Sequence, residues 1–266
     1  MKLNHLNDSY CSTHNRNCFT SLPCAGPIPG ALPGSTSIEV IVVTFHQDGV
    51  LKTLINSVKS QMLAKHFDGS HEPGHHVNYD DGWEPYPHWK LHIIHDGHDS
   101  FFHKMKDDLT RNGYLDERIT FTCSETRGEY TSTGHANRHH GLMNLASKDS
   151  DYVLVINGDT YFVPTIFQWI DTTHRLHNPD LIYWDIVHRE IQDCHNKGGL
   201  SSHLCAGAID WVSVAIKTKI AQSVGINSRA VAADWEYIAA ALGITPENSS
   251  PNISTYKIGK ILAAHN

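Results

Sequence analysis

The sequence has 266 residues, 40% of them hydrophobic, which is enough for one large domain with a buried core. Its formal net charge of −7 argues against a basic surface for nucleic acid, and it contains no run of roughly 18 apolar residues that would span a membrane. Its N-terminus lacks the apolar stretch of a secretory signal, so we expect a soluble, cytoplasmic protein.

Residues 1–36 predict an irregular N-terminal arm, because they are polar and then rich in Pro and Gly. The arm contains Cys11, His14, Cys18 and Cys24, whose spacing matches no zinc signature. The chain has six cysteines and no CxxC pair, so we expect reduced thiols, with a zinc knuckle as the less favoured alternative.

Regular structure is predicted to begin at residue 37. Residues 38–43 form an apolar, β-branched run, which is typical of a strand buried on both faces of a parallel sheet. Apolar residues then recur at helical spacing over 49–64, which predicts an amphipathic helix. Strand, turn and helix in this order are half of a nucleotide-binding unit.

Residues 65–88 form a polar insertion rich in histidines, acids and aromatics. A loop of this length is usually functional or disordered, so a lid that contacts the acceptor and a passive insertion remain equal alternatives. Metal binding by its clustered side chains would be adventitious. These side chains are His75, His76, Asp80 and Asp81.

Strands and helices alternate in the next segment. Strands are predicted at 89–95 and 118–123, and helices at 100–111 and 131–146. This alternation predicts an α/β fold in which helices flank a mostly parallel central sheet. We therefore expect residues 37–160 to be a nucleotide-binding half.

The pivotal stretch is 151–164, where the apolar run 152–156 ends in Asn157, Gly158 and Asp159. Ligands of open α/β sheets bind outside the carboxyl ends of the strands, so Asp159 is placed to hold a metal or a polar ligand. The alternative is that Asp159 caps the following helix, which is predicted from Pro164 to about residue 175.

Residues 161–266 predict an acceptor-binding half. Strands are expected at 181–187 and 255–263, and a helix is expected within 230–242, which has a helical apolar face. Asp210 and Trp211 are candidate acceptor-binding residues; the Trp211 ring either stacks on a sugar or packs in the core.

Four segments together resemble the family 2 glycosyltransferases, which have the GT-A fold. They are IEVIVVTFHQDGVLKTLINSVKSQ, KLHIIHDGHDS, GHANRHHGLMNLA and VLVINGDTYFVP. The resemblance covers about residues 38–170 and implies a single Rossmann-like GT-A domain over 37–266.

The resemblance also implies a nucleotide site. Asp96 would accept a hydrogen bond from the pyrimidine ring nitrogen, and Arg138 would face the diphosphate. The full set implied is Thr44, Phe45, His46, Asp96, Gly97, Arg138, Asn157 and Gly158.

Asp159 matches the second, metal-binding acid of the family's DxD motif, which implies Mn²⁺ or Mg²⁺ as cofactor. The chain departs from the family in Asn157, which replaces the first acid, and in His139, which stands where Asn is usual. His265 resembles a metal-binding histidine found after the core of such enzymes and would compensate for Asn157; a frayed tail is the alternative.

The family's general base is an acid at the start of a late helix, and Asp234 matches it, with Glu236 as a substitute. A carboxylate beside apolar groups has the raised pKa that suits a base. The alternative for Asp234 is an N-terminal helix cap.

These features predict a metal-dependent, inverting glycosyltransferase. It would move a sugar from a nucleotide sugar, with UDP favoured over GDP, to a hydroxyl of a glycan or another acceptor. The alternatives are a non-catalytic nucleotide- or carbohydrate-binding protein on a decayed transferase fold, and a sugar-phosphate nucleotidyltransferase. The turn TFHQDG lacks the Gly-rich loop expected of the latter.

Overall fold

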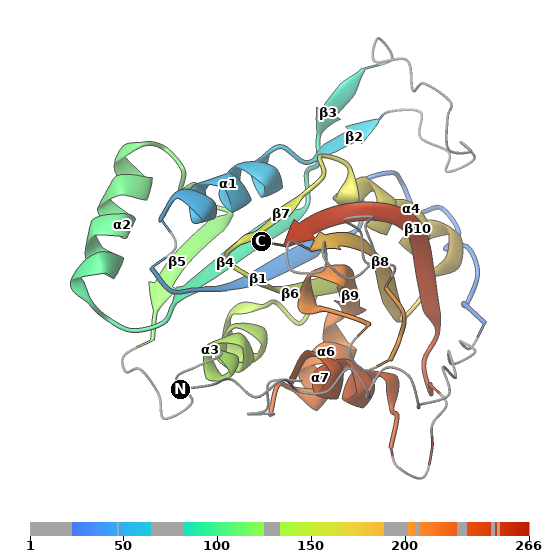
Figure 1. Cartoon of the computed structure of the whole chain (residues 1–266). Helices are drawn as coiled ribbons and strands as arrows, with labels where there is room; N and C mark the ends of the chain where they lie inside the picture. Colours follow the sequence, from blue (N-terminus) through green and yellow to red (C-terminus); the bar gives the residue numbers. More distant parts are fainter. Residues whose placement is uncertain are drawn as a thin grey trace.

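The computed structural model describes most of the chain (Figure 1). The described residues are 23–46, 48–64, 82–124, 134–188, 202–205, 208–227, 233–245, 248 and 251–265. Within these ranges no helix has both the length and the apolar character needed to cross a lipid bilayer.

An eight-stranded sheet forms the centre of the molecule. Its strands, in the order in which they lie side by side, are β5 (Ile119–Cys123), β4 (Trp89–His95), β1 (Ile38–Thr44), β6 (Tyr152–Asn157), β9 (Val214–Lys217), β8 (Leu181–His188), β10 (Thr255–His265) and β7 (Thr160–Phe162). The first four strands run parallel, β8 and β10 are parallel to each other, and β9 and β7 are antiparallel to their neighbours. The predicted mostly parallel α/β sheet is confirmed.

Strand β1 is buried on both faces, as its apolar run predicts. Val40 and Val42 belong to the core on one side of the sheet, whereas Ile41 belongs to the core on the other. Because successive side chains of a strand point to opposite faces, a continuous apolar run is the pattern required between two helical layers.

Helices cover both faces of the sheet (Figure 1). One layer contributes to the core of Val40 and Val42 and contains α1 (Asp48–Lys59), α2 (Ser100–Arg111) and α4 (Ile166–His177). The other layer contains α3 (His135–His140), the π-helical turn η2 (Gly141–Leu145), α6 (Thr218–Val224) and α7 (Ala233–Leu242).

The helix predicted over 49–64 is too long at its C-terminal end. Helix α1 ends at Lys59, and β2 (Met62–Ala64) pairs antiparallel with β3 (Trp83–Pro85). The Met62 amide donates to the carbonyl of Pro164 at 2.8 Å, so a tertiary contact replaces the helical hydrogen bond at this point. Residues 65–81 of the predicted insertion, including its clustered histidines and acids, lie outside the described residues.

The helix predicted over 131–146 is also modified. Residues 131–133 lie outside the described part, and α3 passes into η2 at Gly141, where Ala146 N donates to Gly141 O at 3.0 Å. A Cβ on Gly141 would lie 2.5 Å from Ile41 Cγ2 and 2.8 Å from Ile94 Cδ1. The backbone here lies directly on β1 and β4, which requires glycine.

The described part of the N-terminal arm packs along α4. Ile28 N donates to Arg175 O at 2.8 Å, and Gly34 N donates to the buried Asp171 carboxylate at 3.0 Å. Residues 1–22, with three of the four side chains considered for a zinc knuckle, are outside the described residues.

Candidate functional site

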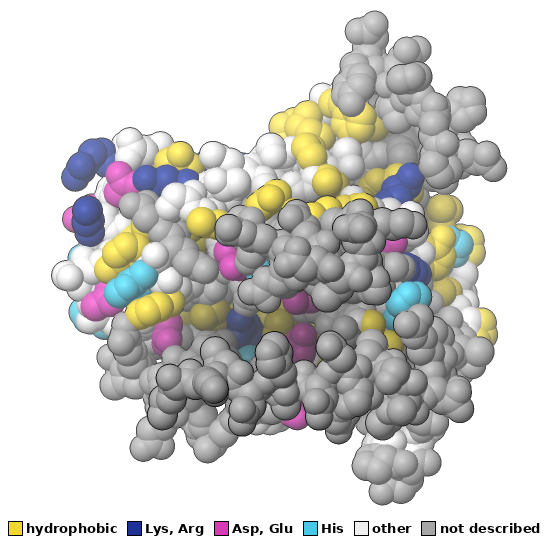
Figure 2. Space-filling model, viewed as in Figure 1, with side chains coloured by type: hydrophobic (Ala, Val, Ile, Leu, Met, Phe, Trp, Pro, Cys, Tyr) yellow, Lys and Arg dark blue, Asp and Glu magenta, His cyan; other side chains and the backbone are white. Residues whose placement is uncertain are grey.

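The ends of β1, β4 and β6 meet at one edge of the sheet. Their register pairs Thr44 with His95 and Val43 with Asn157, so the turns that follow these strands begin at the same level. In the space-filling view, acidic side chains and a Lys or Arg side chain are visible around the centre of the molecule (Figure 2). The predicted site residues of the three turns therefore lie at a common edge, as the parallel sheet requires.

The last strand brings His265 to Asp159. Strand β10 pairs with the short strand β7 so that His265 lies opposite Thr160, the residue after Asp159. As a result His265 Nε2 lies 3.3 Å from Asp159 Oδ1. His265 is the final paired residue of a strand, so the frayed-tail alternative is wrong.

Asp210 contacts the other ring nitrogen of His265, with Oδ2 3.5 Å from Nδ1. The same carboxylate caps the short helix η4 (Trp211–Ser213), where Oδ1 accepts from Val212 N at 3.0 Å. Cap and ring contact use different oxygens, so the backbone fixes the Asp210 side chain in an orientation that faces the histidine. Asp210 was predicted only as an acceptor-binding residue.

His265 is strongly biased toward the charged imidazolium when no cation is present. Burial alone lowers its pKa, but the contacts with Asp159 and Asp210 outweigh burial and raise the pKa to about 10. A metal on Nε2 would replace that proton and leave Nδ1–H facing Asp210. This is the usual arrangement in which a carboxylate orients a metal-binding histidine.

The Asp159 carboxylate has capacity left to act as a ligand. Apart from its 3.3 Å contact with His265 Nε2, Oδ1 is a buried oxygen with no hydrogen-bond partner within the described ranges. Helix α4 has Thr165 as its N-cap, so the prediction that Asp159 alternatively caps this helix is wrong. One carboxylate and one imidazole are a donor set that suits Mn²⁺, so the residues present fit the implied metal.

Asn157 bridges Arg138 and His265. Arg138 Nη2 donates to Asn157 Oδ1, and Asn157 Nδ2 lies 3.2 Å from His265 Nε2. The amide oxygen accepts from the guanidinium, whereas the amide N–H has an acceptor in Nε2 only when that nitrogen carries neither a proton nor a metal. Asn157, which replaces the first acid of the DxD motif, therefore holds Arg138 in place.

Arg138 is recessed, with only 6% of its surface exposed. Its guanidinium also contacts His135 Nδ1 at 3.1 Å and lies 5.3 Å from the Trp211 ring centre. Burial lowers the pKa of Arg138 to about 10, although the charges of three carboxylates oppose the shift. Those carboxylates are Asp210, Asp234 and Asp159.

Trp211 is a packing residue, with 6% of its surface exposed. Its ring stacks on Tyr237 of α7 with a centroid separation of 5.2 Å. Of its two predicted alternatives the geometry favours core packing, because the ring supports Arg138 on one side and α7 on the other.

Asp234 and Glu236 differ in their surroundings. Asp234 is half-buried in the first turn of α7. Burial, and secondarily the negative charge of Asp210, raise its pKa, although a hydrogen bond from Trp235 N opposes the shift. Glu236 is exposed. Because α7 begins at Ala233, Asp234 is inside the helix and is not its N-cap.

The side-chain amide of Asn137 lies in the predicted base pocket beside Asp96. Asp96 Oδ1 accepts from Asn137 Nδ2 at 2.9 Å, and Asp96 N donates to Thr44 O at 2.9 Å, which joins the two turns. Phe45 is 42% exposed beside them. Gly97 N donates to Ser124 Oγ, and Gly158 N donates to Val43 O, so both glycines hold the turns in place.

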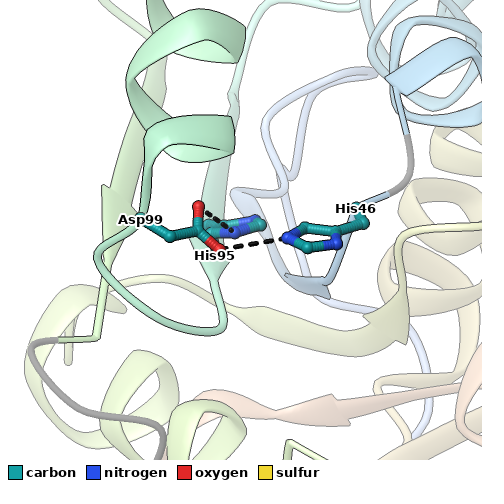
Figure 3. A group of neighbouring side chains, drawn as sticks. All are labelled: His46, His95 and Asp99. Atoms are coloured by element: carbon teal, nitrogen blue, oxygen red, sulfur yellow. Dashed lines mark hydrogen bonds and ion pairs between the residues drawn. The ribbon is translucent and has the colours of Figure 1, made fainter.

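His46 contacts Asp99 at the start of α2. Its Nε2 lies 3.0 Å from Asp99 Oδ2, and His95 Nε2 lies 3.4 Å from Oδ1 of the same carboxylate (Figure 3). His46 therefore joins a separate cluster of titratable side chains next to the predicted base pocket.

Sequence reasoning missed the supporting residues. Asn137 and His135 face Asp96 and Arg138 from α3, and His139 accepts from Ile226 N at 3.1 Å, which ties α3 to the end of α6. The only local signal was their position beside Arg138 in one short helix. Their partners are distant in sequence, so the pairing depends on the fold.

No protein-family model matches the sequence, and no curated protein matches it by sequence similarity. Solved structures do match the fold. TarS 1–349 from S. aureus aligns over 87% of this chain with a TM-score of 0.58 and 12% identity. Its complex with UDP-GlcNAc aligns over 86% of the chain with a TM-score of 0.57 and 12% identity.

The mannosyltransferase PcManGT from Pyrobaculum calidifontis, solved with GDP-Man and Mn²⁺, aligns over 91% of this chain with a TM-score of 0.55 and 12% identity. The chain spans 60%, 58% and 60% of the lengths of these three chains. These structures are GT-A glycosyltransferases, so the predicted fold class is confirmed. At 12% identity the likeness shows the fold alone.

Proposed function

We propose that this chain is a metal-dependent, inverting glycosyltransferase that takes its sugar from a nucleotide sugar, with UDP as the favoured nucleotide. The observation that carries the proposal is the convergence of Asp159, His265 and Arg138 with Asp234 at one edge of a GT-A sheet. Solved neighbours of the same fold bind UDP-GlcNAc and GDP-Man. The domain is taken to cover residues 37–266, with the nucleotide-binding half in residues 37–160 and the acceptor-binding half in residues 161–266.

Donor binding would rest on two groups of residues. Asp96, oriented by Asn137, accepts the ring N–H of uracil, while Thr44 and Phe45 lie beside the base. Asp159 and His265 would hold Mn²⁺, which when bound neutralises charge on the leaving diphosphate. The recessed guanidinium of Arg138 adds fixed positive charge beneath it and keeps Asn157 in place.

The transfer step follows from these positions. Asp234 takes the proton from the acceptor hydroxyl as its oxygen attacks the anomeric carbon, and the bond to the diphosphate breaks with its electron pair on the leaving oxygen. Attack and departure on opposite faces invert the configuration. Burial next to Asp210 keeps the pKa of Asp234 raised, which makes it a stronger base than an ordinary exposed carboxylate.

Release of nucleoside diphosphate from UDP- and GDP-sugars tests the proposal. We expect release from a UDP-sugar with Mn²⁺ that is abolished by a chelator and by Asp159→Asn. Asp149→Asn, an exposed carboxylate outside the site, is the matched control and should match the wild type. Metal-dependent binding of a nucleotide sugar without release or transfer would instead support the non-catalytic alternative, which Asn157 favours.

A further inference from the structure

A second cluster of metal-binding side chains lies beside the predicted base pocket. His46 follows β1, His95 ends β4, and Asp99 precedes α2 (Figure 3). One ligand atom from each side chain lies within 4.8 Å of the other two. None of these side chains contacts Asp159 or His265 among the described interactions, so the cluster is separate from the proposed donor metal.

The spacing of the cluster suits a small transition metal. His46 Nε2 lies 3.0 Å from Asp99 Oδ2, and His95 Nε2 lies 3.4 Å from Asp99 Oδ1, so each imidazole faces its own oxygen of the carboxylate. Ligand atoms around a tetrahedral zinc lie about 3.3 Å apart, because the bonds are about 2.0 to 2.1 Å long. Two imidazoles and one carboxylate are also a common zinc set with one position left open.

The buried Nε2 of His95 has an unmet need for a bonding partner. Its side chain is 1% exposed, and within the described residues Nε2 is a buried nitrogen with no hydrogen-bond partner, directed at Asp99. Buried polar atoms are nearly always satisfied, so this nitrogen indicates a missing ligand. Asp99 uses only one of its two oxygens to cap α2. Oδ1 accepts from Phe102 N at 2.9 Å, whereas Oδ2 faces His46.

Aromatic rings hold the two imidazoles in position. The His46 ring lies 4.0 Å from Phe45 and 4.6 Å from Phe101, and His95 packs between Phe101 and Phe102 at 5.5 and 6.0 Å. Ligands fixed in advance lose little freedom on binding, which favours affinity.

We propose that His46, His95 and Asp99 form a second metal site, selective for Zn²⁺ or a similar transition ion, that clamps the turn after β1 to the start of α2. Phe45 lies in this turn directly after Thr44, so the bound ion orders one wall of the predicted base pocket. The inference does not depend on the transferase proposal, because the metal is bound by this cluster alone.

Titration of the full chain with Co²⁺, followed by its visible absorption, and with Zn²⁺, followed by calorimetry, tests the site. The informative variants are Asp99→Asn, which keeps an equally good helix cap, and His46→Asn, which suits the positive φ of 50° at this position. His98→Gln is the matched control, since His98 is an exposed histidine of the same turn outside the cluster.

The wild type and His98→Gln should each bind one more equivalent of metal than Asp99→Asn or His46→Asn, and Asp159→Asn should keep the equivalent that the cluster binds. Zn²⁺ should raise the unfolding temperature of the first group more than that of the second. The proposal is overturned if Asp99→Asn and His46→Asn bind the same number of ions with the same affinity as the wild type. Because the comparison is a difference between variants, binding by the many other histidines cancels.

Discussion

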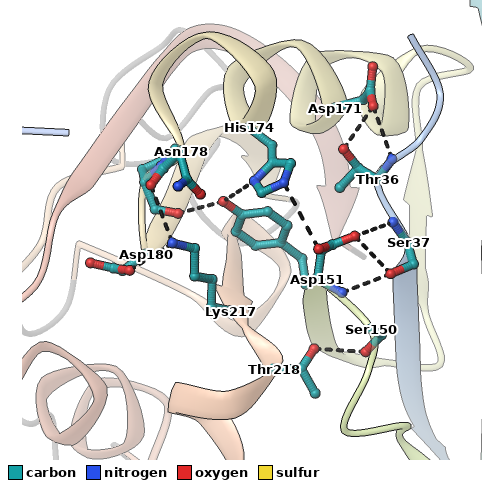
Figure 4. Close-up of polar contacts among 12 residues, drawn as sticks. Thr36, Ser37, Ser150, Asp151, Asp171, His174, Asn178, Asp180, Lys217 and Thr218 are labelled. Atoms are coloured by element: carbon teal, nitrogen blue, oxygen red, sulfur yellow. Dashed lines mark hydrogen bonds and ion pairs between the residues drawn. The ribbon is translucent and has the colours of Figure 1, made fainter. Parts of the chain in front are cut away.

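Substitution of Asp171 by Asn should destabilise the whole domain, because this fully buried carboxylate joins the N-terminal arm to α4 (Figure 4). Oδ1 accepts from Thr36 N and from Thr36 Oγ1, at 3.2 and 2.7 Å. Oδ2 accepts from Gly34 N at 3.0 Å and from Arg175 Nε at 2.9 Å. Asp171 is thus an acceptor for four donors.

The expected loss follows from the donors that Asn cannot satisfy. Its Oδ1 keeps both bonds from Thr36, but its NH₂ then faces two further donors, Gly34 N and Arg175 Nε. Each lost bond to a charged group is worth about 1.5 to 3 kcal/mol, so the two together cost about 3 to 6 kcal/mol. Breaking a buried ion pair costs about 3 to 5 kcal/mol, which agrees.

Urea and thermal unfolding measure this effect. A loss of about 3 to 5 kcal/mol lowers the unfolding temperature by roughly 6 to 20 °C in a domain of this size. Asp149→Asn makes the same chemical change at an exposed position and should leave the unfolding temperature unchanged. A loss below about 1 kcal/mol for Asp171→Asn would show that the four-donor network does not hold the arm on α4.

Two further substitutions test the site and the packing beneath it. Asp234→Asn should lower kcat by about 10² to 10⁴-fold and remove the acidic limb of the pH profile. That limb should lie above the ordinary Asp pKa of about 4, since burial raises the pKa and the base works only when deprotonated; a limb at or below 4 would contradict the assignment. Gly141→Ala should cost about 1 to 3 kcal/mol, because the new methyl group meets Ile41 and Ile94, whereas Gly49→Ala, with open space around it, should be neutral or stabilising; equal unfolding midpoints for the two variants would refute the close packing of η2.

The fold could be predicted where local patterns decide it. Strand β1 is apolar throughout because both of its faces are buried, and α2 has apolar residues at helical spacing because one of its faces is buried. The predicted bounds of both elements are therefore nearly those observed. The C-terminal end of α1 could not be predicted, because the carbonyl of Pro164 captures the Met62 amide from a distant part of the chain. Strand β7 has three residues, too few to show any periodicity.

In the candidate site, the residues at strand ends could be predicted from the sequence, but their distant partners could not. Asp96 and Asp159 follow buried strands, and their position at the sheet edge is a consequence of parallel topology. The partners of Asp159 are not local: His265 reaches it through the β7–β10 register, and Asp210 reaches His265 through a helix cap. The contacts of Asn157 likewise depend on the fold, which places Arg138 and His265 on either side of it.

The central claim is that a nucleotide sugar binds through a metal held by Asp159 and His265. Calorimetric titration of the wild type with a UDP-sugar, with and without Mn²⁺, tests it most directly. We predict binding that requires Mn²⁺, that is lost in Asp159→Asn and that is kept in Asp149→Asn. Equal affinity with and without Mn²⁺, or undiminished affinity in Asp159→Asn, would contradict the claim.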